Sequence, residues 1–242
     1  MKSKNLLDIV FENDQFLAVN KPAGLLTIPD RHDEHIPSLY QLLQKKYEKI
    51  FIVHRLDRET SGLLLFAKDE VTHKYLNQVF ELRKVEKFYL GLVTGSPGNA
   101  SGIMEYPISE HPTIKGMMVI DRKGKPSQTE YQVIEDYGIY SLVKFQLHSG
   151  RTHQIRVHSK QLGHPLACDE VYGNGKPILL SSFKKKFKLS ASEEEERPML
   201  NRIALHSYEL IFKGPDGKDY DIKADLPKDM QALLNQLKKN RR

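Results

Sequence analysis

Apolar and polar residues alternate along several short stretches near the start of the chain, the pattern of half-buried β-strands. Two further runs are continuously apolar and short, which predicts strands buried on both faces. The N-terminal strands are expected at residues 8–12, 15–20, 51–53 and 63–67. Between the first two stands Asn13-Asp14, a pair typical of tight turns, so a hairpin is expected here.

From residue 86 onward the pattern is mostly that of strands, separated by turn residues. These strands are expected at 88–93, 102–108, 116–120, 127–135, 140–147, 203–212 and 218–223. The last two flank Gly214-Pro215-Asp216-Gly217, a further hairpin turn. Because successive strands follow one another through short turns, antiparallel pairing is favoured.

Apolar residues three and four apart predict four helices. One begins at Pro37 with Leu39, Leu42 and Leu43 on one face, one follows a cap at Asp69, one covers His153–Leu162, and one begins near Pro227. Regular alternation of strand and helix is missing. The chain therefore predicts an α+β fold: a mixed, mostly antiparallel central sheet with flanking helices, in a single domain over residues 1–242.

Composition limits the possible functions of the chain only a little. The 242 residues carry a formal net charge of +6, which fits a polyanionic partner such as RNA but does not require one. No apolar run approaches the roughly 20 residues of a membrane helix, and no signal peptide is evident, so a cytoplasmic location is expected. The single cysteine, Cys168, excludes an internal disulfide and any multi-cysteine metal site, and we expect it to be a packed core residue.

The first candidate for chemistry is the charged loop His54–Gly62, which lies between two predicted buried strands. Its carboxylate, Asp57, stands between Arg55 and Arg58, and nearby cations keep a carboxylate ionised and attract anions. Buried flanking strands would hold such a group rigidly. The alternative is an ordinary surface loop with ion pairs.

The second candidate, Ser149–His158, joins a strand to the start of a helix. Free N–H groups at a helix N-terminus suit anions, and Arg151 and Arg156 add positive charge. The alternative is a capped helix with solvated arginines. A metal site formed by His148, His153 and His158 is disfavoured, since a spacing of five residues does not align side chains on a helix.

The third candidate is the strand that contains Lys87, Phe88 and Tyr89. Lys87 and Tyr89 point to the same face because side chains alternate along a strand. An aromatic ring there could stack on an RNA base. The alternative is an ordinary half-buried tyrosine.

Together, and in this order, these motifs resemble those of RluA-type RNA pseudouridine synthases. The similarity is carried by Val19–Gly24, Val53–Leu64, Lys87–Val93, Gly150–His158 with its continuation through Gly163–Leu166 and Asp169–Gly173, and the closing segments Ala204–Ser207 and Asp225–Pro227. It covers nearly the whole chain. The resemblance implies the pseudouridine synthase fold with a central active-site cleft.

It also implies the reaction. A uridine is isomerised to its C-glycoside without a metal or organic cofactor: the N1–C1′ bond breaks, the base turns, and a C5–C1′ bond forms. Asp57 would be the nucleophile or stabilising carboxylate, and Arg151 would pair with it. Tyr89 would stack on the uracil and help to remove the proton at C5. Arg55 would fill the gap left by the flipped base. The expected substrate contacts further include Lys87, Thr152, His153, Arg156 and Leu205.

A single carboxylate agrees with an isomerisation, because a hydrolytic glycosidase usually needs two. The resemblance leaves the target open between large-subunit ribosomal RNA, transfer RNA or both. The small RNA-binding domain that precedes the catalytic domain in many relatives is expected to be absent, and the protein is expected to be a monomer without an obligate protein partner. The acidic segment Ser192–Arg197 is expected to be an exposed loop that points away from RNA.

The sequence disfavours two other functions. A catalytically silent RNA-binding protein with the same fold is disfavoured by the intact Asp57, Tyr89 and Arg151. A kinase-like interpretation of His54–Asp57 fails, because the aspartate is one residue late and no glycine-rich phosphate loop precedes it.

Overall fold

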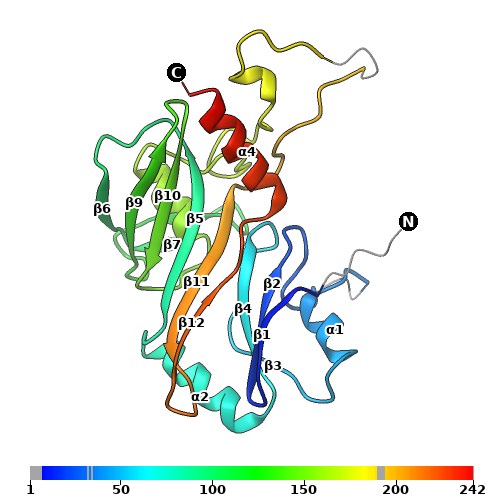
Figure 1. Cartoon of the computed structure of the whole chain (residues 1–242). Helices are drawn as coiled ribbons and strands as arrows, with labels where there is room; N and C mark the ends of the chain where they lie inside the picture. Colours follow the sequence, from blue (N-terminus) through cyan, green and yellow to red (C-terminus); the bar gives the residue numbers. More distant parts are fainter. Residues whose placement is uncertain (1–6, 32, 34, 190–193, 242) are drawn as a thin grey trace. The chain divides into compact units, whose positions relative to one another are not determined.

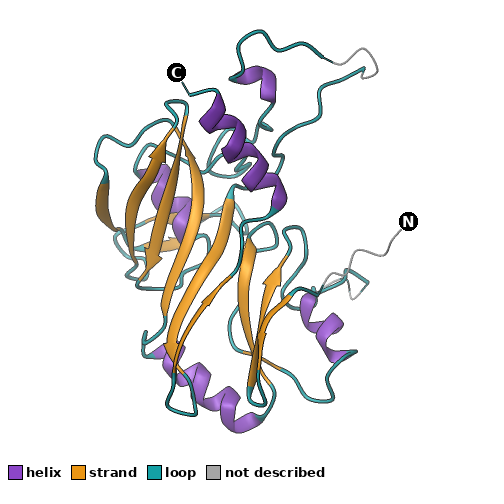
Figure 2. Ribbon diagram, in the orientation of Figure 1, coloured by secondary structure: helices purple, strands orange, loops and turns teal. Residues whose placement is uncertain are grey.

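The computed structural model describes residues 7–31, 33, 35–189 and 194–241 (Figure 1). The chain divides into two compact units. Unit 1 comprises Met1–Tyr89 and His206–Asp225, and unit 2 comprises Leu90–Leu205 and Leu226–Arg242. Strands predominate in both, and helices are few (Figure 2). Every helix in the described part of the chain is too short or too polar to span a bilayer.

Unit 1 is built on a mixed sheet in which β4 is central. The strands are β1 (Ile9–Glu12), β2 (Phe16–Lys21), β3 (Phe51–Ile52), β4 (Ser61–Ala67), β11 (Leu205–Lys213), β12 (Asp219–Lys223) and the start of β5 (Glu86–Thr94). Their order is β1-β2-β4-β11-β5, with β12 on β11 and β3 on β4. The pairs β1–β2, β2–β4, β3–β4 and β11–β12 are antiparallel, whereas β4 and β11 run parallel. The predicted mixed, mostly antiparallel sheet is thereby confirmed.

Side-chain caps begin both helices of unit 1, and the cap at Asp69 is the predicted one. The Asp69 carboxylate accepts the N–H of Thr72 at 2.8 Å and starts α2 (Glu70–Glu81). Helix α1 (Leu39–Gln44) is capped by Ser38, so Pro37 precedes the cap instead of lying in the first turn. Leu76 and Val79 of α2 pack into a core of apolar residues from β2, β4, β11 and β12.

Unit 2 contains an antiparallel sheet and a separate small hairpin. The rest of β5 is followed in the sheet by β10 (Tyr140–Leu147), β9 (Gln128–Asp136) and β6 (Ser101–Glu105). The strand expected over 102–108 is wrong in one respect: β6 ends at Glu105, and β7 (Ile108–Glu110) instead pairs with β8 (Met118–Ile120). Pro107 lies at the break, because proline has no N–H for the ladder and restricts the residue before it.

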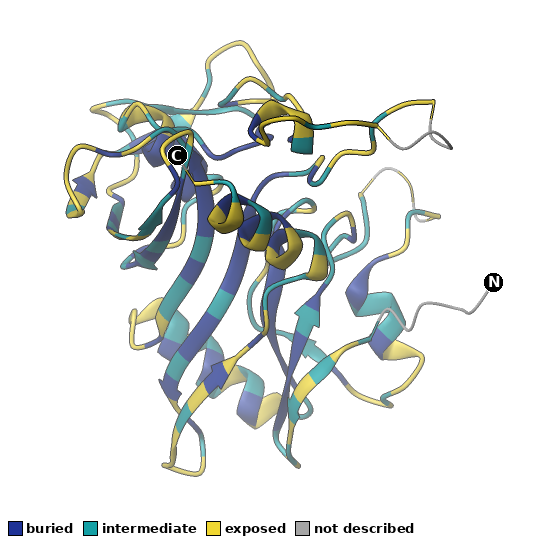
Figure 3. Cartoon of the chain, turned by 45° about the horizontal axis from the view of Figure 1, so that its top comes forward, coloured by how far each residue is buried: buried dark blue, intermediate teal, exposed yellow. Residues whose placement is uncertain are grey.

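The helices of unit 2 are α3 (Gln154–Gln161), α4 (Lys228–Lys239) and the short 3₁₀ helix η1 (Leu180–Ser182). Helix α4 buries Met230, Leu233, Leu234 and Leu237 in the core, while its outer face is exposed (Figure 3). The same core contains Cys168, which is packed and buried as expected.

The parallel contact between β4 and β11 leaves no room for a side chain at Gly62. Its φ is +114°, and an added Cβ would lie 2.2 Å from the carbonyl oxygen of Ser207. We expect Gly62→Ala to destabilise the protein by more than about 3 kcal/mol, since backbone strain and a backbone clash combine. Gly217→Ala, also at positive φ but in open space, is the matched control and should cost about 1 kcal/mol. Equal shifts of the two urea midpoints would contradict this interpretation.

Candidate active-site loop and its surroundings

Asp57 lies in unit 1 on the loop that joins β3 to β4. The residue is half-buried, and its own carbonyl oxygen accepts the N–H of Thr60 at 3.1 Å, which closes a tight turn before β4. Arg55 and Arg58 are exposed on either side. The loop therefore presents one partly shielded carboxylate between two solvated cations.

A buried lysine anchors this loop from β2. The Lys21 side chain is 0% exposed, and its ammonium donates to the carbonyl oxygens of Leu25 at 2.8 Å, Pro22 at 3.0 Å and Arg58 at 3.0 Å. Removal of an ammonium from water costs several kcal/mol, and hydrogen bonds to a charged group offset this cost. The lysine thus joins the loop after β2 to the residue that follows Asp57.

Backbone and hydroxyl contacts join the same two loops at more points. The N–H of Gly24 donates to the Arg58 carbonyl at 2.9 Å, and Arg58 Nε donates to the Gly24 carbonyl at 3.1 Å. Thr27 Oγ1 donates to the Leu56 carbonyl at 3.0 Å and accepts the Leu56 N–H at 3.2 Å. The residues on both sides of Asp57 are therefore fixed by main-chain hydrogen bonds.

At the far end of the loop, a buried histidine holds the start of β4. His206 Nε2 lies 3.1 Å from the carbonyl oxygen of Ala224, so this nitrogen carries the proton and donates. Its Nδ1 is then the acceptor for the Ser61 hydroxyl, at 3.0 Å. His206 and Ser61 are also register partners between β11 and β4. Ser61, four residues after Asp57, is thereby fixed to two neighbouring segments.

Tyr89 lies on β5, the strand beside β11, and is only 8% exposed. Burial raises the pKa of its phenol to about 12, the nearby Ser207 hydroxyl lowers it, and the negative charge of Asp57 raises it further. The phenol is accordingly neutral at physiological pH. Asp57 and Tyr89 both belong to unit 1.

His54 begins the motif but is not placed as a base. Its Nε2 accepts the N–H of Leu65 at 3.1 Å, and its ring stacks on Phe80. Burial, with a smaller effect from Lys87, lowers the pKa of His54 to about 3. Burial likewise lowers the pKa of Lys87, with Arg83 adding to the effect. His54 is therefore a neutral structural residue that ties the loop to β4.

The Arg151 segment lies in unit 2, between β10 and α3, as expected. The buried amide of Gln154 holds it: Oε1 accepts the N–H of Arg151 at 3.0 Å and the hydroxyl of Ser149 at 2.8 Å. Arg151 is half-buried, and its Nε donates to the Pro126 carbonyl at 3.2 Å. The following residue, Thr152, is exposed.

His153 and Arg156 are engaged by neighbours within unit 2. His153 has a positive φ of 55° at the start of α3, and its Nδ1 lies 2.9 Å from the Tyr172 hydroxyl. Arg156 is buried, and its Nε and Nη2 donate to the two carboxylate oxygens of Asp169 at 2.8 and 2.9 Å. Burial of the Asp169 carboxylate acts to raise its pKa, but the hydrogen bonds and positive charge of Arg156 lower it. Leu205 is buried where β11 begins.

The histidines weighed as metal ligands have separate partners. His148 Nε2 lies 3.0 Å from a Glu130 carboxylate oxygen, and His158 Nδ1 lies 3.0 Å from Thr129 Oγ1. Within the described residues, no three His, Cys, Asp or Glu side chains are grouped so that they could hold a metal ion. The expected acidic loop falls partly outside the described residues; its members Glu194 and Glu195 are exposed.

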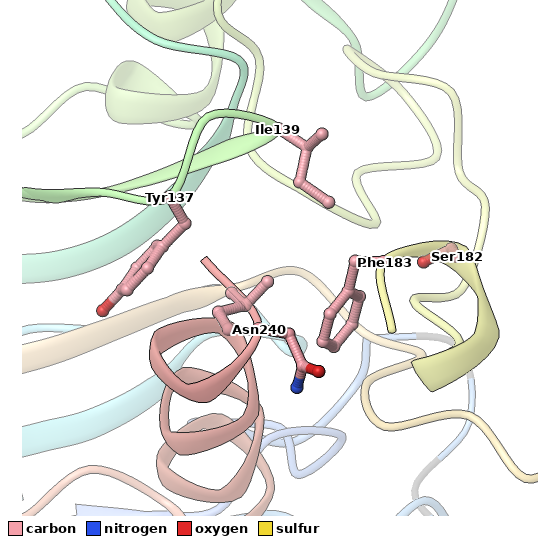
Figure 4. A pocket seen from close by; sticks show the side chains of 6 residues that line it. Tyr137, Ile139, Ser182, Phe183 and Asn240 are labelled. Carbon is pink, nitrogen blue, oxygen red and sulfur yellow. The ribbon is translucent and has the colours of Figure 1, made fainter. Parts of the chain in front are cut away.

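Unit 2 also contains a small pocket beside the end of α4 (Figure 4). It is lined by Tyr137, Ile139, Ser182, Phe183, Leu237 and Asn240. The phenol of Tyr137 is its one titratable group, and the rest of the lining is apolar or neutral. This pocket lacks the carboxylate that the sequence motifs indicate.

Two residues of structural importance were missed in the sequence. Lys21 stands in a loop motif, and nothing in the local pattern indicates that its ammonium is buried. Gln154 was seen as a helical position, and nothing in the spacing indicates that its amide supports the Arg151 turn.

Comparisons with known proteins agree on one family. The family described as RNA pseudouridylate synthase matches residues 15–161. The dual-specificity RNA pseudouridine synthase RluA of Vibrio vulnificus is 40% identical over 192 residues, which cover 77% of this chain and 76% of that protein. Ribosomal large subunit pseudouridine synthase D of Nitrosomonas europaea is 36% identical and covers 96% of this chain, which spans 65% of that relative's length.

Solved structures are similar over nearly the whole chain. Human RNA pseudouridylate synthase domain containing 4 superposes with a TM-score of 0.71 at 25% identity and covers 96% of this chain and 93% of its own. Human RNA pseudouridylate synthase domain containing 1 gives 0.70 at 26% identity, with 98% of both chains covered.

The Lys21 anchor leads to a stability prediction. Lys21→Met removes the ammonium from three buried carbonyl oxygens, of which that of Arg58 keeps a second donor, the Gly24 N–H. We therefore expect a loss of at least about 3 kcal/mol and faster amide exchange at Gly24. Lys68→Met is the control: Lys68 Nζ binds one carbonyl, that of Asn13, and Glu12 nearer the surface, so about 1 kcal/mol is expected. Urea unfolding and hydrogen exchange measure both. Similar losses, with Gly24 protected in both variants, would argue against the anchor.

A second prediction concerns the pH response of His54. Because its folded pKa is about 3 and an unfolded histidine titrates near 6.5, the unfolded chain takes up the proton first, and this residue's contribution to stability is lost as pH falls below 6.5. NMR of the imidazole should show no titration of His54 between pH 5 and 8. His54→Gln should remove this part of the pH dependence. A midpoint near 6.5 in the folded protein would refute the assignment.

Proposed function

Because this chain belongs to the RNA pseudouridylate synthase family, we propose that it isomerises a specific uridine in structured RNA to pseudouridine. The names of the relatives refer to the ribosomal large subunit and to dual specificity. We therefore take large-subunit ribosomal RNA, transfer RNA, or both as the substrate class. The whole chain is proposed to act as one catalytic domain.

The observation that carries this proposal is that unit 1 contains both the fixed Asp57 loop and the buried Tyr89. A half-buried carboxylate, fixed through the backbone on both sides, acts on the pKa of a buried phenol on a neighbouring strand. A preorganised group of this kind needs no rearrangement when the substrate binds. The loop also carries two exposed arginines, which suit RNA phosphates.

In this mechanism, Asp57 supplies the negative charge that the reaction needs. When the N1–C1′ bond breaks, Asp57 either stabilises the positive charge at C1′ or bonds transiently to C1′ of the sugar or C6 of the base. The uracil turns, C5 bonds to C1′, and any bond to Asp57 breaks. The C5 proton then leaves to solvent, and N1 takes up a proton. Tyr89 provides a flat face for the uracil. Because its pKa is about 12, Tyr89 takes part as a neutral phenol and not as a phenolate.

The remaining proposed contacts follow from the resemblance of the sequence motifs to those of the family. Arg55 is exposed and is proposed to enter the RNA stack, and Lys87, Thr152, His153 and Leu205 are proposed to border the substrate. Arg151 is proposed to pair with Asp57. For Arg156 we propose a scaffold role, because it is buried and its Nε and Nη2 both donate to buried Asp169.

We further propose that the protein acts in the cytoplasm as a monomer. The residues assigned here carry the reaction without a metal or organic cofactor, because the isomerisation has no net oxidation and activates no water. The charge of +6 then serves to bind phosphates around the target.

The test is tritium release from RNA labelled at C5 of uridine, taken from cells that lack this enzyme. The wild type should release tritium, and Asp57→Asn should be slower by at least about 10³-fold, since the variant retains the shape but not the charge. Glu59→Gln, two residues away on the same loop, is the matched control and should stay within about threefold. Equal release by Asp57→Asn would assign the chemistry to another residue, and RNA binding without release by any protein would favour a silent binder.

A further inference from the structure

A buried serine without a partner lies beside Tyr89. Ser207 is 0% exposed, and its Oγ has no hydrogen-bond partner among the residues that the structure describes. An unsatisfied buried hydroxyl costs about 1–3 kcal/mol, so a fold retains one only where something offsets the cost. Ser159 on α3 is the other such hydroxyl within the described chain.

The backbone, not the side chain, determines where Ser207 lies. It is the register partner of Gly62 in the short parallel contact between β11 and β4. An added Cβ at Gly62 would lie 2.5 Å from the Ser207 nitrogen and 2.2 Å from its oxygen, so the two main chains are in direct contact. The position of the Ser207 Cα is thus set by this main-chain contact, and the hydroxyl is positioned by rotation about the Cα–Cβ bond.

Strand β11 lies between β4, which follows the Asp57 loop, and β5, which carries Tyr89. Ser207 is therefore placed between the two residues assigned to the reaction. Its hydroxyl is near enough to the phenol to lower the Tyr89 pKa, against the effects of burial and of Asp57. A hydroxyl acts in this direction when it donates its proton to the phenol oxygen.

We propose that Ser207 is a positioning residue, whose hydroxyl donates a hydrogen bond to the Tyr89 phenol oxygen and holds the ring in place against the substrate uracil. The inference rests on the proposed function of Asp57 and Tyr89. A rotation about one side-chain bond completes the hydrogen bond. No bond to the substrate is made or broken by Ser207, so its effect reaches the reaction only through Tyr89.

The first test needs no catalytic activity. The protein is labelled with 3-fluorotyrosine, whose phenol ionises at lower pH, and the Tyr89 signal is assigned in ¹⁹F NMR by its loss in Tyr89→Phe. We expect Ser207→Ala to raise the ionisation midpoint of Tyr89 and to broaden its signal. Ser159→Ala removes the other unpartnered buried hydroxyl and should leave the midpoint unchanged. An unchanged midpoint in Ser207→Ala would overturn the proposal, whether or not tritium release is observed.

The second test is a double-mutant cycle on tritium release. Ser207→Ala should lower kcat about fivefold, the worth of one neutral hydrogen bond, with KM for RNA within about twofold. In the Tyr89→Phe background, the same substitution should have no further effect. A fivefold loss in both backgrounds would mean that Ser207 acts independently of Tyr89 and would contradict the proposal. If the wild type released no tritium, the proposed function would fail, and the ¹⁹F measurement alone would decide on Ser207.

Discussion

The geometry of the candidate site depends on one buried ammonium. Lys21 sits at the end of β2, fully removed from water, and donates to three carbonyl oxygens, one of which belongs to Arg58. A charge in this position would be strongly unfavourable if the surrounding carbonyls did not converge on it. The loop after β2 and the loop that bears Asp57 therefore adopt one joint conformation.

Further hydrogen bonds fix the loop on both sides of Asp57. Thr27 holds Leu56, Gly24 holds Arg58, and the Ser61–His206 hydrogen bond fixes the first residue of β4. These contacts act on the backbone or on buried hydroxyls, and Arg58 adds one hydrogen bond from its Nε to the Gly24 carbonyl. A backbone fixed in this way holds the side chains of the loop in defined positions.

The surroundings of Tyr89 set the pKa of its phenol. Burial and the negative charge of Asp57 both raise the pKa of the phenol, whereas the Ser207 hydroxyl lowers it. Arg156 lies in the same motif as Arg151, but its guanidinium donates two hydrogen bonds to the Asp169 carboxylate. This contact supports the segment that carries Arg151. The type of a residue in a motif thus does not determine its task; its burial and partners do.

Much of the fold was predictable because the patterns are local. The Asp69 cap, the apolar run that became β4 and the helix after His153 each follow from a few neighbouring residues. The break at Pro107 was missed because alternation of residues on both sides of the proline looked continuous. In the site, Asp57, Arg55, Lys87 and Tyr89 were identified from motif and order, and the structure places all four in unit 1. Lys21 and Ser207 were not identified, because a buried ammonium and an unpartnered hydroxyl are defined by contacts between distant strands, which no local pattern encodes.

The most direct measurement is a nucleotide-resolution map of pseudouridine in ribosomal and transfer RNA. It compares cells that lack the gene and are complemented with either the wild type or Asp57→Asn, expressed at equal levels. The account predicts that one or a few uridines are modified with the wild type and remain unmodified with Asp57→Asn. Identical maps in the two strains, with modification restored in both, would contradict the assignment of Asp57 as the catalytic carboxylate.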